Sequence, residues 1–378
     1  MPAVSRRSFH RAFSLLAAGA ALPFYNEAAL AQRAMGGRRN SGDAVKINSN
    51  ENPMGPCPEA LEAMSAIAPQ GGRYGDSQVY DAQSALAEIE GVDTNYVKMY
   101  AGSSDPLHRF VIASCNKDKP FVYGEPGYEA GGRAAAYVGA QAIGVPLVPG
   151  TMVHDVKAMV KAHPTPGILY VCNPNNPTGT VNTKEEIEWL VANKPAGSIV
   201  LLDEAYIHLS SKATPASYLV KQGKDVVILR TFSKLYGMAG IRAGAVIARP
   251  ELQQRTSMYT TGFLPVQSMV AATASLRSKN LVAERRKIIA DIREDTFAFL
   301  QKNNIEFLPS DANMFMMNAK RPGRVFASQM AAKGIMIGRT WPSMPNWPRV
   351  TIGTREEMQK FQAACLECYH AADSGAGL

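Results

Sequence analysis

Short apolar runs alternate with amphipathic segments from about residue 95 onward, and Gly, Pro, Asn or Asp bound most of them. Nearly continuous apolar runs are typical of strands that are buried on both faces, as in parallel sheets covered by helices. The pattern therefore predicts an α/β fold with a mainly parallel sheet flanked by helices. Its predicted strands are residues 97–101, 120–124, 167–172, 198–203, 226–231 and 243–248.

The pattern changes after residue 264. A long helical pattern over 268–304 precedes a few short strand-like runs and a closing helix from residue 355. This region predicts a second, smaller α/β domain over 265–378. The large domain is predicted over 73–264, and residues 32–72 are predicted to form a tether and an arm that joins the small domain.

The first 31 residues have the order of a secretory signal. Arg6 and Arg7 form a basic head, residues 12–24 are apolar, and small residues follow at 29–31. The paired arginines resemble the twin-arginine type, which exports folded proteins. We therefore expect a periplasmic or exported protein that uses the twin-arginine export machinery. The alternative is a disordered basic N-terminus with an amphipathic helix.

Composition disfavours several classes of partner and site. The net charge is +8 over 378 residues, but no dense basic block is interleaved with aromatic residues, which disfavours nucleic acid as a partner. No later apolar stretch is long enough for a stable membrane anchor. The five cysteines are scattered, and helical packing is the favoured interpretation of Cys365 and Cys368 over redox or metal chemistry. No metal site is predicted.

Polar residues follow the predicted strands, at the edge where parallel sheets collect ligands. Ser103 and Ser104 open a helix, whose free N–H groups suit a phosphate, although taken alone they are better explained as a simple helix cap. Tyr128 suits stacking on a planar ring, or plain packing. The loop over 173–179 is rich in Asn and Pro, which make it rigid. Asp203 ends a buried strand and invites a protonated ring nitrogen, or caps a helix.

Lys234 follows the strand over 226–231. A partly desolvated lysine has a lowered pKa and attacks carbonyl groups, whereas a surface lysine would only aid solubility. Thr231, Ser233 and Arg242 suit a phosphate. A stacking ring, an acid, a phosphate site and a nucleophilic lysine are together what pyridoxal phosphate requires of a protein.

These motifs resemble the fold-type I pyridoxal-phosphate enzymes of aminotransferase class I/II, and within them the histidinol-phosphate aminotransferases. The resemblance runs from about residue 45 to the C-terminus. It rests on NENPMGP (50–56), RYGD (73–76), NPNNPTG (173–179), DEAY (203–206), RTFSKLYGMAGIR (230–242) and RVTIGTREEM (349–358).

The resemblance implies a role for each matching residue. Lys234 would bind the cofactor covalently as a Schiff base and move a proton at the substrate. Asp203 would keep the pyridine nitrogen protonated. Tyr206 and Asn176 would hydrogen-bond the ring hydroxyl, and Tyr128 would stack on the ring.

The resemblance also implies which residues bind the cofactor phosphate and which bind the substrate. The phosphate site would comprise Ser103, Ser104, Thr231, Ser233 and Arg242. Tyr74 would reach the cofactor of the neighbouring subunit, which implies a homodimer. Arg349 would clamp the substrate α-carboxylate, and Arg339 and Asn52 are further substrate-binding candidates.

The chain departs from the family pattern near its second arginine. Gly338 separates the GIMI run (334–337) from Arg339, whereas the family commonly places an arginine directly after this run. Trp341 and Trp347 follow and suit either a pocket for an aromatic or apolar side chain or structural packing. With the signal sequence, these departures disfavour histidinol phosphate as the substrate.

The sequence predicts an exported, homodimeric aminotransferase that moves an amino group between an amino acid, or a histidinol-phosphate-like amine, and a 2-oxo acid. A lyase, decarboxylase or racemase is the alternative that uses the same cofactor. A non-catalytic periplasmic binding protein is the alternative of another class. The presence of Lys234, Asp203 and Arg349 disfavours it.

Overall fold

The computed structural model describes residue 27, residues 44–259 and residues 262–371. The predicted signal sequence over 1–31 and most of the tether lie outside the described residues, with Glu27 as the exception. Among the helices described, none combines the length and the apolar character that crossing a membrane requires.

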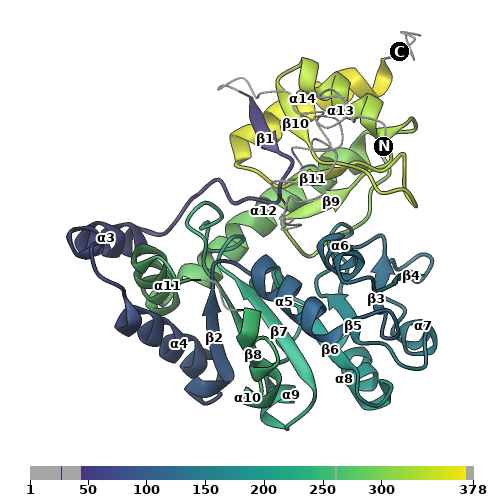
Figure 1. Cartoon of the computed structure of the whole chain (residues 1–378). Helices are drawn as coiled ribbons and strands as arrows, with labels where there is room; N and C mark the ends of the chain where they lie inside the picture. The colour runs from purple at the N-terminus through teal and green to yellow at the C-terminus, as the bar shows by residue number, and fades with distance from the viewer. Residues whose placement is uncertain (1–26, 28–43, 260–261, 372–378) are drawn as a thin grey trace, which may run out of the picture.

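A large sheet forms the centre of the lower part of the molecule (Figure 1). In the described chain it has seven strands in the order β2-β8-β7-β6-β5-β3-β4. The prediction of a mainly parallel sheet is confirmed, because β3 to β7 pair in parallel and only the pairs that involve β8 are antiparallel. The strands are β2 (Val97–Tyr100), β3 (Phe121–Glu125), β4 (Ala142–Pro146), β5 (Ile168–Cys172), β6 (Ile199–Asp203), β7 (Val226–Thr231) and β8 (Gly244–Ala248).

The pairing brings the predicted strand ends to one edge. Since β8 is antiparallel to both β2 and β7, these two strands run in the same direction as β3, β5 and β6. Their carboxyl ends therefore share an edge with the amino end of β8. This edge faces the upper part of the molecule in Figure 1.

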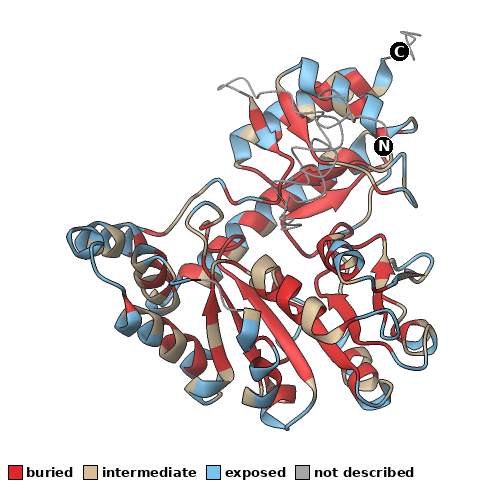
Figure 2. Ribbon diagram, viewed as in Figure 1, coloured by how far each residue is buried: buried red, intermediate tan, exposed pale blue. Residues whose placement is uncertain are grey.

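Helices flank the sheet and bury its strands on both faces. Strands β5, β6, β7 and β8 consist of buried residues, as the red ribbon of Figure 2 shows. Removing these apolar side chains from water supplies most of the driving force for this packing. The helices are α5 (Ser104–Ser114), α6 (Ala130–Tyr137), α7 (Val156–Lys161), α8 (Lys184–Asn193), α9 (Ser217–Lys221) and α10 (Pro250–Gln254).

A smaller α/β part lies above the sheet edge (Figure 1). Strand β1 (Val45–Ile47) pairs in parallel with β10 (Ile335–Ile337), so the N-terminal arm enters this part. Strand β9 (Met314–Met316) pairs antiparallel with β11 (Arg349–Thr351). Its helices are α12 (Leu281–Lys302), α13 (Gly323–Ala332) and α14 (Arg355–His370).

The single helix predicted over 268–304 is wrong. The structure has two helices, α11 (Val266–Arg277) and α12, which are separated at Ser278 and Asn280. Ser and Asn compete with the helical backbone for hydrogen bonds and favour helix ends. Helix α11 packs against α3 (Pro58–Ile67) and α4 (Asp76–Glu90), whereas α12 leads into the smaller part.

The cysteines have the structural role that the sequence favoured. All five are free and buried. Cys365 and Cys368 are among the residues that α14 buries, and this confirms the prediction of helical packing.

Candidate active site

A cavity of about 310 Å³ opens at the carboxyl edge of the large sheet. It is large enough for a small organic ligand. Most of the residues that the sequence assigned to a cofactor line it: Ser103, Ser104, Tyr128, Asn176, Asp203, Tyr206, Thr231, Ser233, Lys234 and Arg242.

Lys234 lies in the loop that leaves β7. Its side chain is buried, and its amine donates a weak hydrogen bond to the carbonyl oxygen of Ser49 at 3.4 Å. The amine also lies 5.7 Å from the centre of the Tyr206 ring. Burial lowers the pKa of Lys234 to about 8, so far more of the amine is unprotonated near neutral pH than in an ordinary lysine. The geometry thus provides a nucleophile at the floor of the cavity.

Asp203 ends β6 and supplies the acid. The hydroxyl of Tyr170 donates to its carboxylate at 2.9 Å, and the backbone N–H of Ala205 donates at 3.2 Å. Burial raises the pKa of Asp203. Among the residues that the structure describes, no cation forms an ion pair with this carboxylate. A buried acid of this kind is stabilised by a cationic group of a ligand, such as a protonated ring nitrogen.

The phosphate end of the site lies between α5 and Arg242. The guanidinium of Arg242 donates to the Ala101 carbonyl at 3.0 Å and to the Ser233 hydroxyl at 3.4 Å. Gly102, with φ +94°, leaves room for it, because a Cβ at this position would collide with the guanidinium. The N-terminus of α5 adds free backbone N–H groups and a positive helix end. This cradle fits a phosphate.

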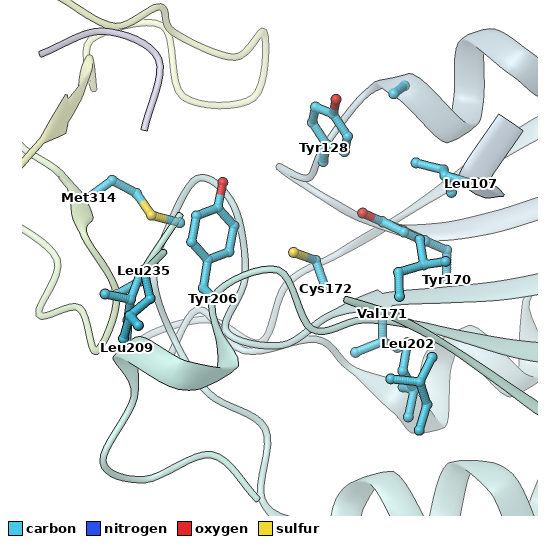
Figure 3. Packing of buried hydrophobic residues seen from close by; sticks show 14 of the residues in the cluster. Leu107, Tyr128, Tyr170, Val171, Cys172, Leu202, Tyr206, Leu209, Leu235 and Met314 are labelled. Carbon is cyan, nitrogen blue, oxygen red and sulfur yellow. The ribbon is translucent and has the colours of Figure 1, made fainter. Parts of the chain in front are cut away.

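Three aromatic or sulfur-bearing side chains surround the space between Asp203, Lys234 and the phosphate cradle. Figure 3 shows Tyr128, Cys172 and Tyr206 approaching it from separate segments. The Tyr128 hydroxyl lies 3.5 Å from the Ser104 hydroxyl, and Asn50 donates to the Tyr206 hydroxyl at 2.9 Å. An apolar space with aromatic walls, an acid, a lysine and a phosphate cradle fits pyridoxal phosphate.

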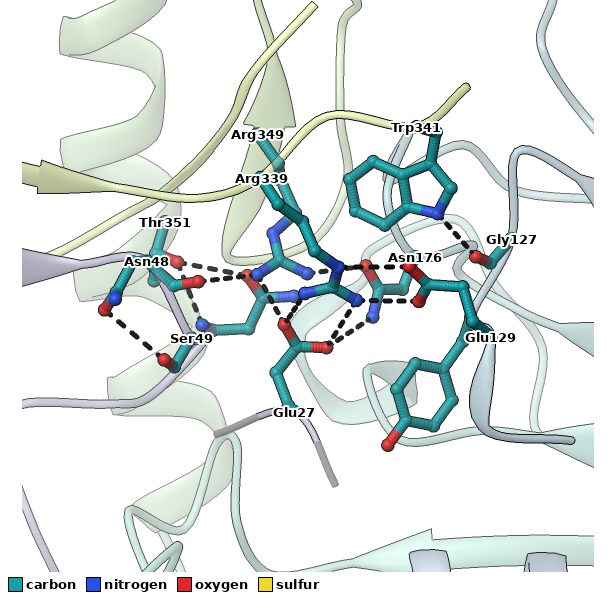
Figure 4. Close-up of polar contacts among 12 residues, drawn as sticks. Glu27, Asn48, Ser49, Gly127, Glu129, Asn176, Arg339, Trp341, Arg349 and Thr351 are labelled. Carbon is teal, nitrogen blue, oxygen red and sulfur yellow. Dashed lines mark hydrogen bonds and ion pairs between the residues drawn. The ribbon is translucent and has the colours of Figure 1, made fainter. Parts of the chain in front are cut away.

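Two arginines extend the site toward the smaller part of the molecule (Figure 4). Arg349 opens β11 and is fully buried. Its guanidinium donates to the Asn176 side-chain oxygen at 2.9 Å and to the Asn48 carbonyl at 2.7 Å. Arg339 follows β10, and backbone hydrogen bonds pair the two segments: Gly338 donates to Arg349 at 2.8 Å, and Arg349 donates to Arg339 at 3.1 Å.

The extra Gly338 has a structural reason. A Cβ at this position would lie 2.6 Å from the Arg349 carbonyl oxygen, so only glycine permits the close pairing of the two segments. The arginine is thereby displaced by one position and still reaches the site. Trp341, also fully buried, packs against both guanidiniums, at 4.7 Å from Arg339 and 5.7 Å from Arg349. Trp341 therefore packs behind the arginines and does not line the cavity.

Two acidic residues at the site were missed by the sequence analysis. Glu27 accepts hydrogen bonds from Arg349 at 2.6 Å and Arg339 at 2.5 Å (Figure 4). Glu129 pairs with Arg339 through both carboxylate oxygens, at 3.1 and 2.7 Å. Glu27 fell within the predicted signal sequence, and Glu129 follows Tyr128 in a turn with no periodic pattern. The only signal in the sequence that could have identified Glu129 is its position directly after Tyr128, a candidate site residue.

Four predicted site residues lie outside the cavity lining: Arg339 and Arg349, which lie beside it as described above, and Asn52 and Tyr74. The Asn52 amide donates to the Leu235 carbonyl at 2.8 Å and thereby holds the arm against the Lys234 loop. Tyr74 is 76% exposed and stacks on Phe263 with ring centres 4.1 Å apart. Trp347 is half-buried on the loop after Trp341 and does not line the cavity either.

The comparisons with known proteins agree with this site. The family model described as aminotransferase class I and II matches residues 42–364. The chain is 31% identical over 332 residues to the histidinol-phosphate aminotransferase of Moorella thermoacetica, which covers 86% of this chain and 85% of that protein. It is also 33% identical over 285 residues to the aromatic amino acid aminotransferase of Cutibacterium acnes. This aligned region covers 74% of this chain and 81% of that protein.

The solved structures agree as well. The histidinol-phosphate aminotransferase from Sinorhizobium meliloti, in complex with pyridoxal 5′-phosphate, superposes with a TM-score of 0.81 at 25% identity. That match covers 92% of this chain and 95% of the other chain. The chain thus belongs to the class I and II aminotransferases, and it is a transaminase that depends on pyridoxal phosphate.

Proposed function

We propose that this enzyme moves the amino group of an α-amino acid to a 2-oxo acid, and that it works as an exported homodimer. The observation that carries the substrate proposal is the convergence of Arg339 and Arg349 on one carboxylate, that of Glu27. This carboxylate stands in for the carboxylate of a substrate. The matching relatives include enzymes named for histidinol phosphate and for aromatic amino acids, so the names alone do not select a substrate.

Pyridoxal phosphate, when bound, supplies the electron sink that stabilises negative charge at the substrate Cα. The residues of the chain provide the remaining functions. Lys234, with its pKa of about 8, is suited to take and return the Cα proton near neutral pH. Asp203 holds a proton on the ring nitrogen. Arg349 orients the substrate carboxylate through its planar fork of N–H donors, and Asn176 fixes the orientation of that fork.

An exposed aromatic pair supports the homodimer. Tyr74 is 76% exposed and Phe263 is 64% exposed, and the two rings stack on each other. Exposed apolar surface of this kind is typical of protein interfaces. Tyr74 is proposed to reach the cofactor phosphate of the partner subunit. Sedimentation of the holoenzyme as a dimer supports this arrangement, and a monomeric, fully active enzyme would contradict it.

The export proposal rests on Arg6 and Arg7 and the apolar segment that follows them. Replacing both arginines with lysine is expected to leave the protein in the cytoplasmic fraction. Export that continues unchanged in this variant would exclude the twin-arginine route.

A product balance tests the reaction. The holoenzyme is incubated with a panel of amino acids and a 2-oxo acid acceptor, and both products are quantified. Transamination predicts one new amino acid for each new 2-oxo acid, with no carbon dioxide released. Release of carbon dioxide, or products that appear without an acceptor, would instead indicate a decarboxylase or lyase.

A further inference from the structure

Glu129 occupies an unusual position for a residue at the start of a helix. It precedes α6 as the N-cap, but its side chain makes no capping hydrogen bond. The side chain instead crosses to the smaller part of the molecule and pairs with Arg339 (Figure 4). The arginine Nε and one terminal nitrogen donate to the two carboxylate oxygens at 3.1 and 2.7 Å. Such two-point pairs are strong and fix the plane of the guanidinium.

This pairing determines which part of Arg339 faces the substrate. The edge formed by Nε and Nη2 is taken by Glu129, so Nη1 is the nitrogen that makes the shorter contact with Glu27, at 2.5 Å. Arg349 donates to the same Glu27 oxygen at 2.6 Å. The two arginines therefore meet at a single carboxylate oxygen, and Trp341 packs against both of them from behind.

Arg339 and Arg349 together form an anion-binding subsite, whose net charge can be counted from its side chains. Arg339 and Arg349 contribute two positive charges, and Glu129 cancels one of them. The subsite thus offers one net positive charge to a substrate, which equals the charge of one carboxylate. A phosphate monoester carries between about 1.5 and 2 negative charges at neutral pH. Its additional charge would face the Glu129 carboxylate across the Arg339 guanidinium.

We propose that Glu129 is a specificity-determining residue, which cancels one arginine charge and restricts the subsite to a monoanionic carboxylate in place of a phosphate monoester. This inference rests on the proposed function, because it takes the arginine pair as the substrate-anion subsite. It names the substrate class as α-amino acids that present one carboxylate to the pair. It also assigns the preference for a carboxylate over a phosphate monoester to Glu129, through its contact with Arg339.

The test compares two inert anions of similar shape, butyrate and propyl phosphate. Their dissociation constants are measured by calorimetry with the full-length holoenzyme and with its Glu129→Gln variant. Glutamine keeps the size of the side chain and removes its charge. We expect the variant to bind propyl phosphate about 10- to 100-fold more tightly relative to butyrate, since the repulsion between charges a few ångströms apart is removed. Glu27 competes with both anions, so it does not bias the ratio.

Two control variants separate charge from structure. Glu125→Gln changes the acid at the end of β3, which accepts from the Ser343 hydroxyl at 3.0 Å and forms no ion pair with the two arginines in the described chain. It is expected to leave the ratio unchanged. Glu129→Asp keeps the charge and is expected to keep the preference for butyrate.

The outcomes are distinguishable. An unchanged ratio in Glu129→Gln, or loss of both anions from that variant, would overturn the inference, as would a wild-type enzyme that already prefers propyl phosphate. Because this assay requires no turnover, a shifted ratio in an enzyme that transaminates no amino acid would contradict only the proposed function. An unshifted ratio in an enzyme that does transaminate amino acids would contradict only the role of Glu129.

Discussion

Glu27 occupies the place of a substrate carboxylate, and its replacement by glutamine gives a sharp prediction for the full-length enzyme. Its side chain is 11% exposed and contacts both Arg339 and Arg349. Burial alone would raise the pKa of Glu27, but the charges of Arg349 and Arg339 outweigh it and hold the pKa well below its usual range. The residue is therefore a carboxylate at every physiological pH, and it competes with the substrate.

The size of the effect follows from these contacts. A hydrogen bond to a charged group contributes about 1.5–3 kcal/mol. Glu27 makes two short ones, and the ordering of the chain around it offsets part of this gain. A net stabilisation of about 2 kcal/mol corresponds to roughly a 30-fold competition, because each 1.4 kcal/mol is a factor of ten. Glu27→Gln is thus expected to lower the apparent KM for an amino acid about 30-fold, with kcat unchanged.

The assay is steady-state transamination by the full-length holoenzyme and its variant across a range of amino acid concentrations. Saturating substrate displaces Glu27, which is why kcat stays constant. Glu62→Gln, a change of the same chemistry at an exposed position on α3, is the matched control and is expected to leave KM unchanged. Equal KM values in wild type and Glu27→Gln would refute the reasoning. Cleavage at the predicted signal site would remove Glu27 and is expected to have the same effect as the substitution.

Three further predictions concern the cofactor cradle and the core. Without cofactor, the rate at which Lys234 captures pyridoxal phosphate should rise with pH and level off above about 8, because the neutral amine attacks; a rate that still rises at the ordinary lysine pKa would contradict this. Gly102→Ala should displace Arg242 and weaken cofactor binding, measured spectroscopically, at least about 10-fold. Gly139→Ala is the matched control, because Gly139 also has a positive φ but no atom lies within 4 Å of the new Cβ, and it should leave cofactor binding unchanged. Arg230→Leu leaves two buried glutamates unpaired and should lower the free energy of unfolding by about 3–5 kcal/mol in denaturant titrations.

The sequence predicted the sheet edge because buried parallel strands have a clear pattern. Strands β5, β6 and β7 carry nearly continuous apolar runs, and their last residues, Cys172, Asp203 and Thr231, line the cavity. Since parallel strands end at a common edge, the residues that follow them are expected to lie together on the strength of the sequence alone. This is why Asp203 and Lys234 were found.

The missed elements lack such a pattern. Strand β4 lies at the edge of the sheet, contains Gly144 and ends at Pro146, and only one of its residues is buried. Edge strands need no continuous apolar run, and Gly and Pro argue against a strand. The antiparallel direction of β8 could also not be predicted from the sequence, because an apolar run does not encode the direction in which it pairs.

The charged partners of the arginines depended on tertiary structure. Glu129 and Arg339 are 210 residues apart, and Glu27 and Arg349 are 322 residues apart. Local patterns cannot report such contacts, since an isolated glutamate in a turn is most often solvated. The anion subsite became apparent only when β10 and β11 brought Arg339 beside Arg349.

Mapping the covalent attachment of the cofactor tests the central claim most directly. The purified holoenzyme is reduced with borohydride, digested, and its peptides are analysed by mass spectrometry. The account predicts a single pyridoxyl phosphate adduct, located on Lys234, and no adduct in Lys234→Ala. An adduct on another lysine, or a wild-type protein that takes up pyridoxal phosphate without any covalent attachment, would contradict it.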